Sequence, residues 1–262
     1  MRARKRFGQH FLEPAWVAKL IATIDPRPEQ TFLEIGPGRG ALTKALAARA
    51  GRVVAVEIDR DLAAALPERV PGTVRVVEGD FLDTDLAALL AGEPHPVRVA
   101  GNLPYNVATP ILARLLESAA NGRVLADATV MLQKEVAERV VARPGSSDYG
   151  PLAVAVALDA DAEAVLILPP GAFRPPPEVT SAVVRMRFHE PAVEVGNRSV
   201  FTRLVRGAFQ QRRKTILNAL GPPAASLGRD PADLLARAGV DPRLRPGDLS
   251  LEAFAALSRA VL

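Results

Sequence analysis

The feature that most constrains the fold of this chain is a regular alternation between residues 31 and 141. Short apolar segments rich in β-branched residues alternate there with segments of helical periodicity, which is typical of a parallel, doubly wound α/β sheet. Two further β segments follow, and a helix at 14–21 precedes. We therefore predict strands at 31–35, 52–59, 74–77, 97–100, 128–133, 164–168 and 181–188.

From residue 190 onward the strand pattern fades and amphipathic helical segments dominate. We predict helices at 201–217, 231–238 and 251–262. The sequence thus predicts two domains, an α/β domain over 1–189 and a small all-α domain over 190–262.

Composition excludes several classes of protein. Hydrophobic residues make up 48% of the 262 residues and charged residues 24%, as in globular proteins. No apolar run reaches the roughly 20 residues that span a membrane, and the basic start lacks the apolar stretch of a secretory signal, so we expect a cytoplasmic protein. Without cysteine, and with only three widely separated histidines, we expect neither disulfides nor a metal site.

Positive charge is unevenly distributed. The net charge is only +4, but residues 1–12 and 203–214 carry several basic side chains and no acidic one. Two such clusters favour a polyanionic partner, although an arginine-rich genome or an ordinary solvated helix face explains them equally well. The candidate phosphate-binding residues are Arg4, Lys5, Arg6, Arg206, Arg212, Arg213 and Lys214.

A glycine-rich turn, residues 36–40, follows the first predicted strand. Glycines there allow tight turns and close approach of a ligand. The pattern Glu-x-Gly-x-Gly-x-Gly differs from the Gly-x-Gly-x-x-Gly of dinucleotide-binding dehydrogenases, which disfavours that reading. Glu57 lies about 20 residues beyond Gly36, at the end of the next strand, where a carboxylate accepts the hydroxyls of an adenosine ribose.

Asp80 and Phe81 follow the third predicted strand. The carboxylate could accept a hydrogen bond from an adenine amine, with the phenylalanine as an apolar wall. Equally, Asp80 could cap a helix at 83–90.

The stretch Asn102-Leu103-Pro104-Tyr105 follows the fourth strand and carries the chemistry. The asparagine carboxamide and the main-chain carbonyl of Leu103 can both accept hydrogen bonds from one exocyclic amine, while Tyr105 offers a stacking surface. The alternative is an ordinary turn with a packed tyrosine. Phe173, in a proline-rich segment at 169–179, is a candidate second stacking surface or else a core residue.

Together these residues resemble the S-adenosylmethionine-dependent methyltransferases, and within them the KsgA-type ribosomal RNA adenine dimethyltransferases. The resemblance runs over nearly the whole chain, and its motifs stand in the family's order. They are residues 7–12 (Phe-Gly-Gln-His-Phe-Leu), 34–40, 57–59, 79–81, 102–105, 173–181 (Phe-x-Pro-x-Pro-x-Val-x-Ser) and 209–214 (Phe-Gln-Gln-Arg-Arg-Lys).

The resemblance implies a seven-stranded Rossmann-like sheet and transfer of methyl groups from S-adenosylmethionine, giving S-adenosylhomocysteine. The acceptor would be N6 of two adjacent adenines in small-subunit ribosomal RNA, within a pre-assembled subunit bound by a monomeric enzyme. His10 stands where the family usually has asparagine; since both side chains form hydrogen bonds, we expect its cofactor contact to survive. The expected cofactor-binding residues are Gln9, His10, Leu12, Gly36, Gly38, Glu57, Ile58, Asp80, Phe81 and Asn102; the expected catalytic residues are Asn102, Leu103, Pro104, Tyr105 and Phe173.

Other functions compete with this one. An Erm-type enzyme that modifies large-subunit RNA shares the motifs, and a ribosome-assembly factor could keep the cofactor site while acting by binding. DNA adenine methyltransferases are less favoured because they carry a proline where Leu103 stands.

Overall fold

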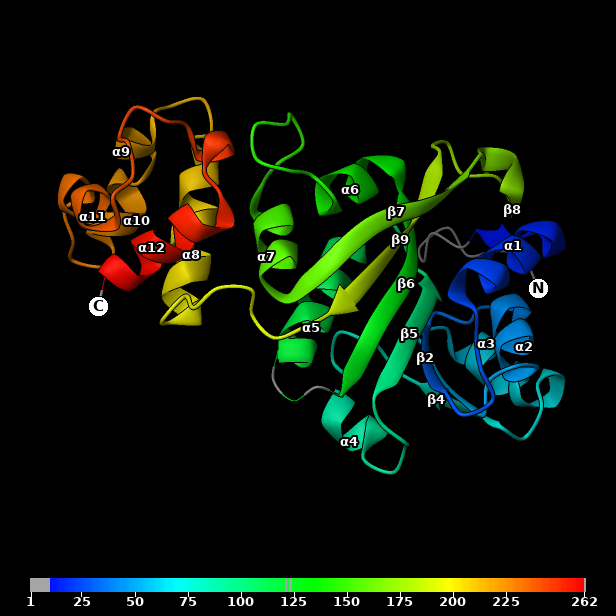
Figure 1. The fold of residues 1–262 in the computed structure, drawn as a ribbon. Helices are drawn as coiled ribbons and strands as arrows, with labels where there is room; N and C mark the ends of the chain where they lie inside the picture. The colour runs from blue at the N-terminus through cyan, green and yellow to red at the C-terminus, as the bar shows by residue number, and fades with distance from the viewer. Residues whose placement is uncertain (1–9, 121, 123, 262) are drawn as a thin grey trace. The chain divides into compact units, whose positions relative to one another are not determined.

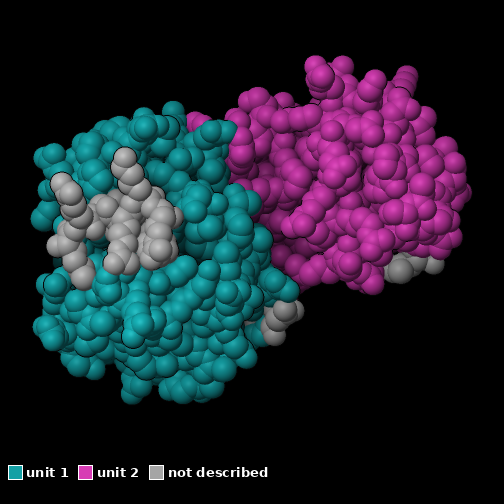
Figure 2. Space-filling view, turned by 180° about the vertical axis from the view of Figure 1, so that it is seen from behind, with its two compact units in different colours: residues 1–137, 161–189 teal, residues 138–160, 190–262 magenta. Residues whose placement is uncertain are grey.

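The computed structural model describes residues 10–120, 122 and 124–261, and its contacts divide the chain into two compact units, coloured separately in Figure 2. Unit 1 is Met1–Ala137 with Asp161–His189, and unit 2 is Glu138–Ala160 with Glu190–Leu262. The segment Glu138–Ala160, which we predicted within the first domain, therefore groups with unit 2. As folding domains, 1–189 and 190–262 stay a prediction.

A seven-stranded sheet in the order β4-β3-β2-β5-β6-β9-β7 forms the centre of unit 1 (Figure 1). Strands β4, β3, β2, β5 and β6 pair in parallel, and β9 pairs antiparallel to β6. This confirms the predicted doubly wound, mostly parallel sheet. The strands span Thr31–Ile35 (β2), Arg52–Glu57 (β3), Val74–Glu78 (β4), Val97–Asn102 (β5), Leu125–Gln133 (β6), Ala160–Leu168 (β7) and Ser181–Phe188 (β9).

Helices lie on both sides of the sheet, with α1 and α2 on one side and α5 on the other (Figure 1). Helix α1 buries Val17, Leu20, Ile21 and Ile24, a helical spacing that forms one apolar face, and these residues join a core with the strands. The helices span Pro14–Ile24 (α1), Ala41–Ala47 (α2), Arg60–Ala65 (α3), Leu86–Leu90 (α4), Ala108–Ala120 (α5) and Lys134–Val140 (α6).

The parallel pairing brings the carboxyl ends of four strands to one edge. Ile35 at the end of β2 pairs with Val56 and Gly101, and Glu57 pairs with Glu78. The loops that follow β2, β3, β4 and β5 therefore meet at this edge, where parallel sheets bind ligands.

A second, two-stranded ladder joins the N-terminal segment to the proline-rich segment. Strand β1 (Phe11–Leu12) pairs antiparallel with β8 (Phe173–Arg174), placing Leu12 opposite Phe173. The main-chain N–H of Glu13 also donates to Ala172 O at 2.9 Å. This ladder anchors residues 10–12 beside the carboxyl edge of the sheet.

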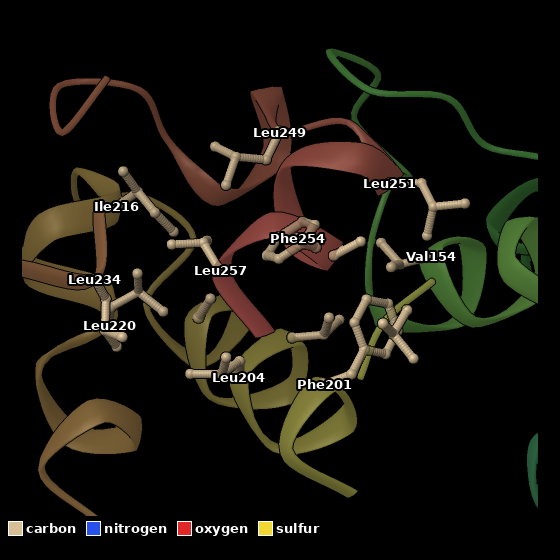
Figure 3. Packing of buried hydrophobic residues seen from close by; sticks show 14 of the residues in the cluster. Val154, Phe201, Leu204, Ile216, Leu220, Leu234, Leu249, Leu251, Phe254 and Leu257 are labelled. Atoms are coloured by element: carbon tan, nitrogen blue, oxygen red, sulfur yellow. The ribbon is translucent and has the colours of Figure 1, made fainter. Parts of the chain in front are cut away.

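Unit 2 is helical and has its own apolar core, centred on the fully buried Phe254 (Figure 3). The α-helices within this unit span Pro151–Asp159 (α7), Arg198–Gln210 (α8), Ile216–Ala219 (α9), Gly221–Ala225 (α10), Pro231–Ala238 (α11) and Leu251–Ala260 (α12).

One sequence prediction about these helices is wrong, and one helix was missed. The helix predicted over 201–217 ends at Gln210, because residues 211–214 form a turn from which α9 and α10 fold back; a Cβ on Gly207 of α8 would lie 2.8 Å from Pro223 of α10. Helix α7 was not predicted, since its sequence PLAVAVALD is almost wholly apolar and lacks a helical period.

In the described part of the chain, no helix is long and apolar enough to cross a membrane.

We predict that Phe254→Ala destabilises unit 2 by about 3–5 kcal/mol, because it leaves a cavity among packed side chains. Urea unfolding measures the loss. Leu244→Ala, at an exposed leucine of the same unit, is the control and should change stability by less than about 0.5 kcal/mol. An equal effect of both substitutions would contradict a core centred on Phe254.

Candidate active site

A cleft of about 850 Å³ opens at the carboxyl edge of the sheet in unit 1. It gathers residues from the β1 segment, the glycine-rich turn and the ends of β3 and β5, which lie far apart in sequence. The predicted site residues that line it are His10, Leu12, Gly36, Gly38, Glu57, Ile58, Asn102, Leu103, Pro104 and Tyr105.

A neighbouring cavity of about 550 Å³ shares three lining residues with this cleft: Gly36, Ile58 and Pro104. Its other walls include the predicted Asp80 and Phe81. The two hollows are therefore neighbours along the sheet edge; Tyr105 lines the first and Asp80 the second.

Asn102 is oriented by the N-terminal segment. Its side-chain Nδ2 donates a hydrogen bond of 2.8 Å to the main-chain oxygen of His10. Because a carbonyl can only accept, this bond assigns the amide nitrogen to His10, and the carboxamide oxygen is the remaining acceptor. The next residue, Leu103, is held by its N–H, which donates to Met131 O at 3.2 Å.

Tyr105 is held at two points. Its hydroxyl lies 2.5 Å from Ser181 Oγ, and its ring stacks on the His10 imidazole with centroids 5.8 Å apart and planes at 22°. Burial raises the pKa of Tyr105, while the serine hydrogen bond lowers it in part. The phenol therefore stays neutral at physiological pH.

Glu57 supports the glycine-rich turn. Its Oε2 accepts from the N–H of Gly38 at 2.8 Å, and its Oε1 accepts from the N–H of Asp59 at 2.9 Å. Burial raises the pKa of Glu57, and the main-chain hydrogen bonds lower it in part. Three main-chain N–H groups, those of Gly38, Ile58 and Asp59, donate to this carboxylate, which still lines the cleft and keeps a lone pair for a ligand hydroxyl.

The turn itself requires glycine. Gly36, Gly38 and Gly40 all have positive φ, at 68°, 58° and 80°. A Cβ on Gly38 would also lie 3.2 Å from the ring of Phe11. The backbone of this turn can thus approach a ligand closely only while these residues lack side chains.

Glu34 is a site residue that the sequence analysis missed. It lines the cleft, is 1% exposed, and its Oε2 has no hydrogen-bond partner among the described residues. Burial raises its pKa from 4.5 to about 8, while the nearby Thr43 hydroxyl lowers it and the charge of Glu57 raises it by smaller amounts. An acid inside the buried strand TFLEI was the signal that could have found it.

The structure separates the two interpretations of Asp80. Helix α4 is capped by Asp85, whose Oδ1 accepts from the N–H groups of Ala87 and Ala88, so Asp80 is not its cap. Asp80 Oδ1 accepts from the N–H of Leu82 at 2.8 Å, and the residue lines the smaller cavity. Its other carboxylate oxygen remains an acceptor for a ligand amine.

Phe173 is the exception among the predicted catalytic residues. Its ring is fully buried in the core of unit 1 and lines neither hollow. A buried ring has no free face for a substrate base, so the prediction of a second stacking surface at this position is wrong in this structure.

Four of the basic residues that we predicted to bind phosphate are among the described residues. Arg206, Arg212, Arg213 and Lys214 are exposed on unit 2. Gln9, Arg4, Lys5 and Arg6 lie outside the described residues.

The residues present fit S-adenosylmethionine. The positive-φ glycines leave room for the close approach of its methionine part, and the Glu57 carboxylate lines the cleft, where it can accept the ribose hydroxyls. Among the described residues, no group of three or more His, Asp or Glu is placed to hold a metal ion.

The model of the family described as ribosomal RNA adenine dimethylase matches residues 1–250 of this chain. Ribosomal RNA small subunit methyltransferase A of Acinetobacter baylyi is 43% identical over 261 residues, covering 98% of this chain and 92% of the relative. The protein of the same name from Geobacter metallireducens is 45% identical over 268 residues, covering 100% and 96%.

Two solved structures are also similar along most of their length. A dimethyladenosine transferase from Plasmodium falciparum superposes with a TM-score of 0.75 at 26% identity, covering 95% of this chain and 96% of that one. The 23S rRNA methyltransferase ErmE superposes with a TM-score of 0.67 at 27% identity, covering 96% and 99%.

The buried Glu34 predicts a pH-dependent stability. The unfolded chain releases this proton near pH 4.5 and the folded chain near pH 8, so the folded state loses stability as the pH rises between these values. Glu34→Gln removes this penalty. In urea unfolding, the free energy of unfolding of the variant minus that of the wild type should increase by a few kcal/mol between pH 5 and pH 8.

The exposed Glu29→Gln is the matched control for that measurement. Its difference from the wild type should stay flat across the same pH range. A flat difference for Glu34→Gln as well would mean that Glu34 ionises normally in the folded protein.

Proposed function

This chain belongs to the ribosomal RNA adenine dimethylase family, and from that membership we infer that it is an S-adenosylmethionine-dependent methyltransferase that dimethylates N6 of adenine in small-subunit ribosomal RNA. Its relatives over almost the full length are named for the small subunit. That naming favours the small subunit over the Erm-type alternative, although the fold is shared with a 23S rRNA methyltransferase.

The observation that carries the proposal is the orientation of Asn102. Its amide nitrogen is bound to His10 O, so its carboxamide oxygen is the acceptor presented at the cleft. An adenine N6 amine has two N–H donors, and it needs two acceptors. The Asn102 oxygen and the Leu103 carbonyl supply them from adjacent residues.

These two acceptors increase the nucleophilicity of the adenine amine, which is low in the free base. The N6 lone pair is delocalised into the adenine ring, and hydrogen bonds that hold both N–H groups favour a pyramidal nitrogen with its lone pair directed outward. Tyr105 stacks on the extruded base, a contact worth about 1–3 kcal/mol in nucleic-acid complexes. Pro104 fixes the backbone between the two groups.

S-Adenosylmethionine supplies an electrophilic methyl group on a sulfonium. We propose that Glu57 accepts its ribose hydroxyls, that Asp80 accepts from its adenine amine, and that Ile58 and Phe81 form apolar walls beside that ring. The remaining proposed cofactor contacts come from Gln9 and Leu12, from Gly36 and Gly38, and from Asn102.

We assign no general base among the described residues that line the cleft. None is required, since N6 becomes acidic as its bond to carbon forms, and its proton leaves through the hydrogen-bonded acceptors. Alignment of the reactants and exclusion of water therefore account for most of the acceleration.

A basic surface of unit 2 supports RNA docking. Three loops are tied together there: Gly145 N–H donates to Gly247 O at 2.8 Å, and Ile216 N–H donates to Leu244 O at 2.6 Å. Arg212 links the loops by donating to Ser147 O at 2.8 Å. The exposed basic side chains on these loops are Arg143, Arg212, Arg213, Lys214, Arg243 and Arg245.

We further propose that the enzyme acts as a monomer on a pre-assembled small subunit, which places it in the cytoplasm. The direct test incubates the protein and methyl-labelled cofactor with unmodified small subunits, large subunits and their free RNAs, and then maps the labelled base. Dimethyladenosine in the small subunit supports the proposal. Label confined to the large subunit would establish the Erm-type alternative. Binding of the protein to the small subunit without any labelled base would establish the assembly-factor alternative.

Asn102→Ala should slow methyl transfer by at least about 100-fold in a single-turnover assay, because the adenine amine loses one acceptor and its alignment. Binding of the ribosomal substrate should stay within about twofold of the wild type, since the docking residues are unchanged. A wild-type transfer rate in this variant would contradict the proposed role.

The paired substitutions Arg213→Gln and Lys214→Gln should weaken RNA binding and flatten its dependence on salt. Each lost phosphate contact lowers the slope of log affinity against log salt by about 1. Neither side chain makes a hydrogen bond or ion pair with another described residue, so the fold should survive, whereas Arg212 is also structural.

The matched control replaces an exposed arginine and lysine of unit 1, Arg49→Gln with Lys44→Gln. Its salt slope should equal that of the wild type. Equal slopes for both double variants would remove Arg213 and Lys214 from the RNA-binding surface.

A further inference from the structure

We propose that the side chains of His10 and Ser181 are positioning residues that clamp Tyr105 in the orientation required to stack the target adenine. This inference rests on the proposed function, in which Tyr105 is the stacking surface. It assigns to His10 a role toward the acceptor base in place of the expected cofactor contact.

His10 meets three parts of the site at once. Its main-chain oxygen accepts from Asn102 Nδ2, its ring stacks on Tyr105, and its Nδ1 lies 2.8 Å from Pro175 O. Because a carbonyl only accepts, Nδ1 must carry the proton, and this fixes both the tautomer and the plane of the imidazole. The Asn102 bond uses only the backbone of His10, so the imidazole itself serves Tyr105 and the proline-rich segment.

Ser181 completes the clamp from another direction. It is fully buried at the start of β9, and its Oγ lies 2.5 Å from the tyrosine hydroxyl. Strand β9 pairs with β6, where Gln133 is the partner of Ser181, so the serine position is set by the sheet. The tyrosine is therefore held at its hydroxyl by a rigid strand.

The two contacts together determine which face of Tyr105 is available. The imidazole covers one face at a centroid distance of 5.8 Å, within the range of offset stacking. The base must then use the opposite face. The Ser181 contact fixes the position of the hydroxyl and so the direction of the Cβ–Cγ axis, while the stacked imidazole sets the plane of the ring about that axis. A stacking surface of fixed plane aligns the adenine amine with Asn102 and Leu103 before the methyl group arrives.

Substitutions at position 10 separate the two contributions of the histidine. His10→Asn keeps a side-chain N–H that can reach Pro175 O but has no ring, whereas His10→Phe keeps a ring but has no donor. His10→Ala lacks both, and Ser181→Ala removes the hydroxyl contact. The exposed His95→Ala is the matched control in unit 1.

The first experiment measures two quantities for each variant: the single-turnover rate of methyl transfer at saturating S-adenosylmethionine, and the Kd for S-adenosylmethionine. We expect His10→Ala and Ser181→Ala to slow transfer by about tenfold each, with the cofactor Kd within about twofold of the wild type. His10→Asn and His10→Phe should each recover part of the rate. His95→Ala should match the wild type.

The second experiment needs no RNA. The chain has two tyrosines, so fluorotyrosine labelling gives two ¹⁹F resonances, of which Tyr105→Phe identifies one. His10→Ala should shift the Tyr105 resonance by removing the ring current of the imidazole, and Ser181→Ala should shift it by removing the hydroxyl contact. The Tyr149 resonance should stay in place in both variants.

Three outcomes would overturn the inference. A tenfold rise in cofactor Kd for His10→Ala, with an unchanged transfer rate at saturation, would make His10 a cofactor contact only. An unmoved Tyr105 resonance in both variants would show that no clamp exists. An active wild type with unaffected variants contradicts the clamp alone, whereas a wild type that methylates no ribosomal RNA contradicts the proposed function, and the ¹⁹F spectra then decide the clamp by themselves.

Discussion

The parallel pairing of β2 with β3 on one side and with β5 on the other is the constraint on which the site depends. Main-chain hydrogen bonds align Ile35 with Val56 and Gly101, so the glycine-rich turn, Glu57 and Asn102 emerge at one edge. No direct contact between these side chains is needed to bring them together. The strand pairing of the sheet brings these residues together, so the residues of the loops can serve ligand binding.

The N-terminal segment adds what the sheet cannot supply. Pairing of β1 with β8 places His10 against Asn102 and Tyr105 of one loop and Pro175 of the proline-rich segment, so one residue links two loops to the N-terminal segment. The site also carries a thermodynamic cost. Two carboxyl groups, Glu34 and Glu57, are buried near each other: burial raises the pKa of Glu34 most, and the charge of Glu57 raises it further, so the ionised form of Glu34 is disfavoured. Such unfavourable burial is common where a cleft must bind a polar ligand.

Most of the α/β unit could be predicted because its segments are short, apolar and punctuated by glycine or acidic residues. The predictions of secondary structure and burial failed where they depended on tertiary contacts, because sequence periodicity carries no information about such contacts. Helix α7 is apolar on all sides and showed no period, and the helix from Arg198 stops at Gln210 because α10 must pack against Gly207. Phe173 had equal claims as a stacking ring and a core ring, and only the packing of unit 1 decided between them.

The sequence by itself determined the fold class and the meeting of the loops at one carboxyl edge of the sheet, and it nominated the residues proposed to bind the ligands, because strand periodicity and turn chemistry are local properties. The tertiary structure alone decided which groups are buried and which meet. It placed Glu34 in the cleft with a raised pKa, made Asp85 the cap of α4 while Asp80 lines the smaller cavity, and set His10 against the ring of Tyr105 and Ser181 at its hydroxyl. Burial and contacts between distant segments depend on how the elements pack, and no local pattern encodes that packing.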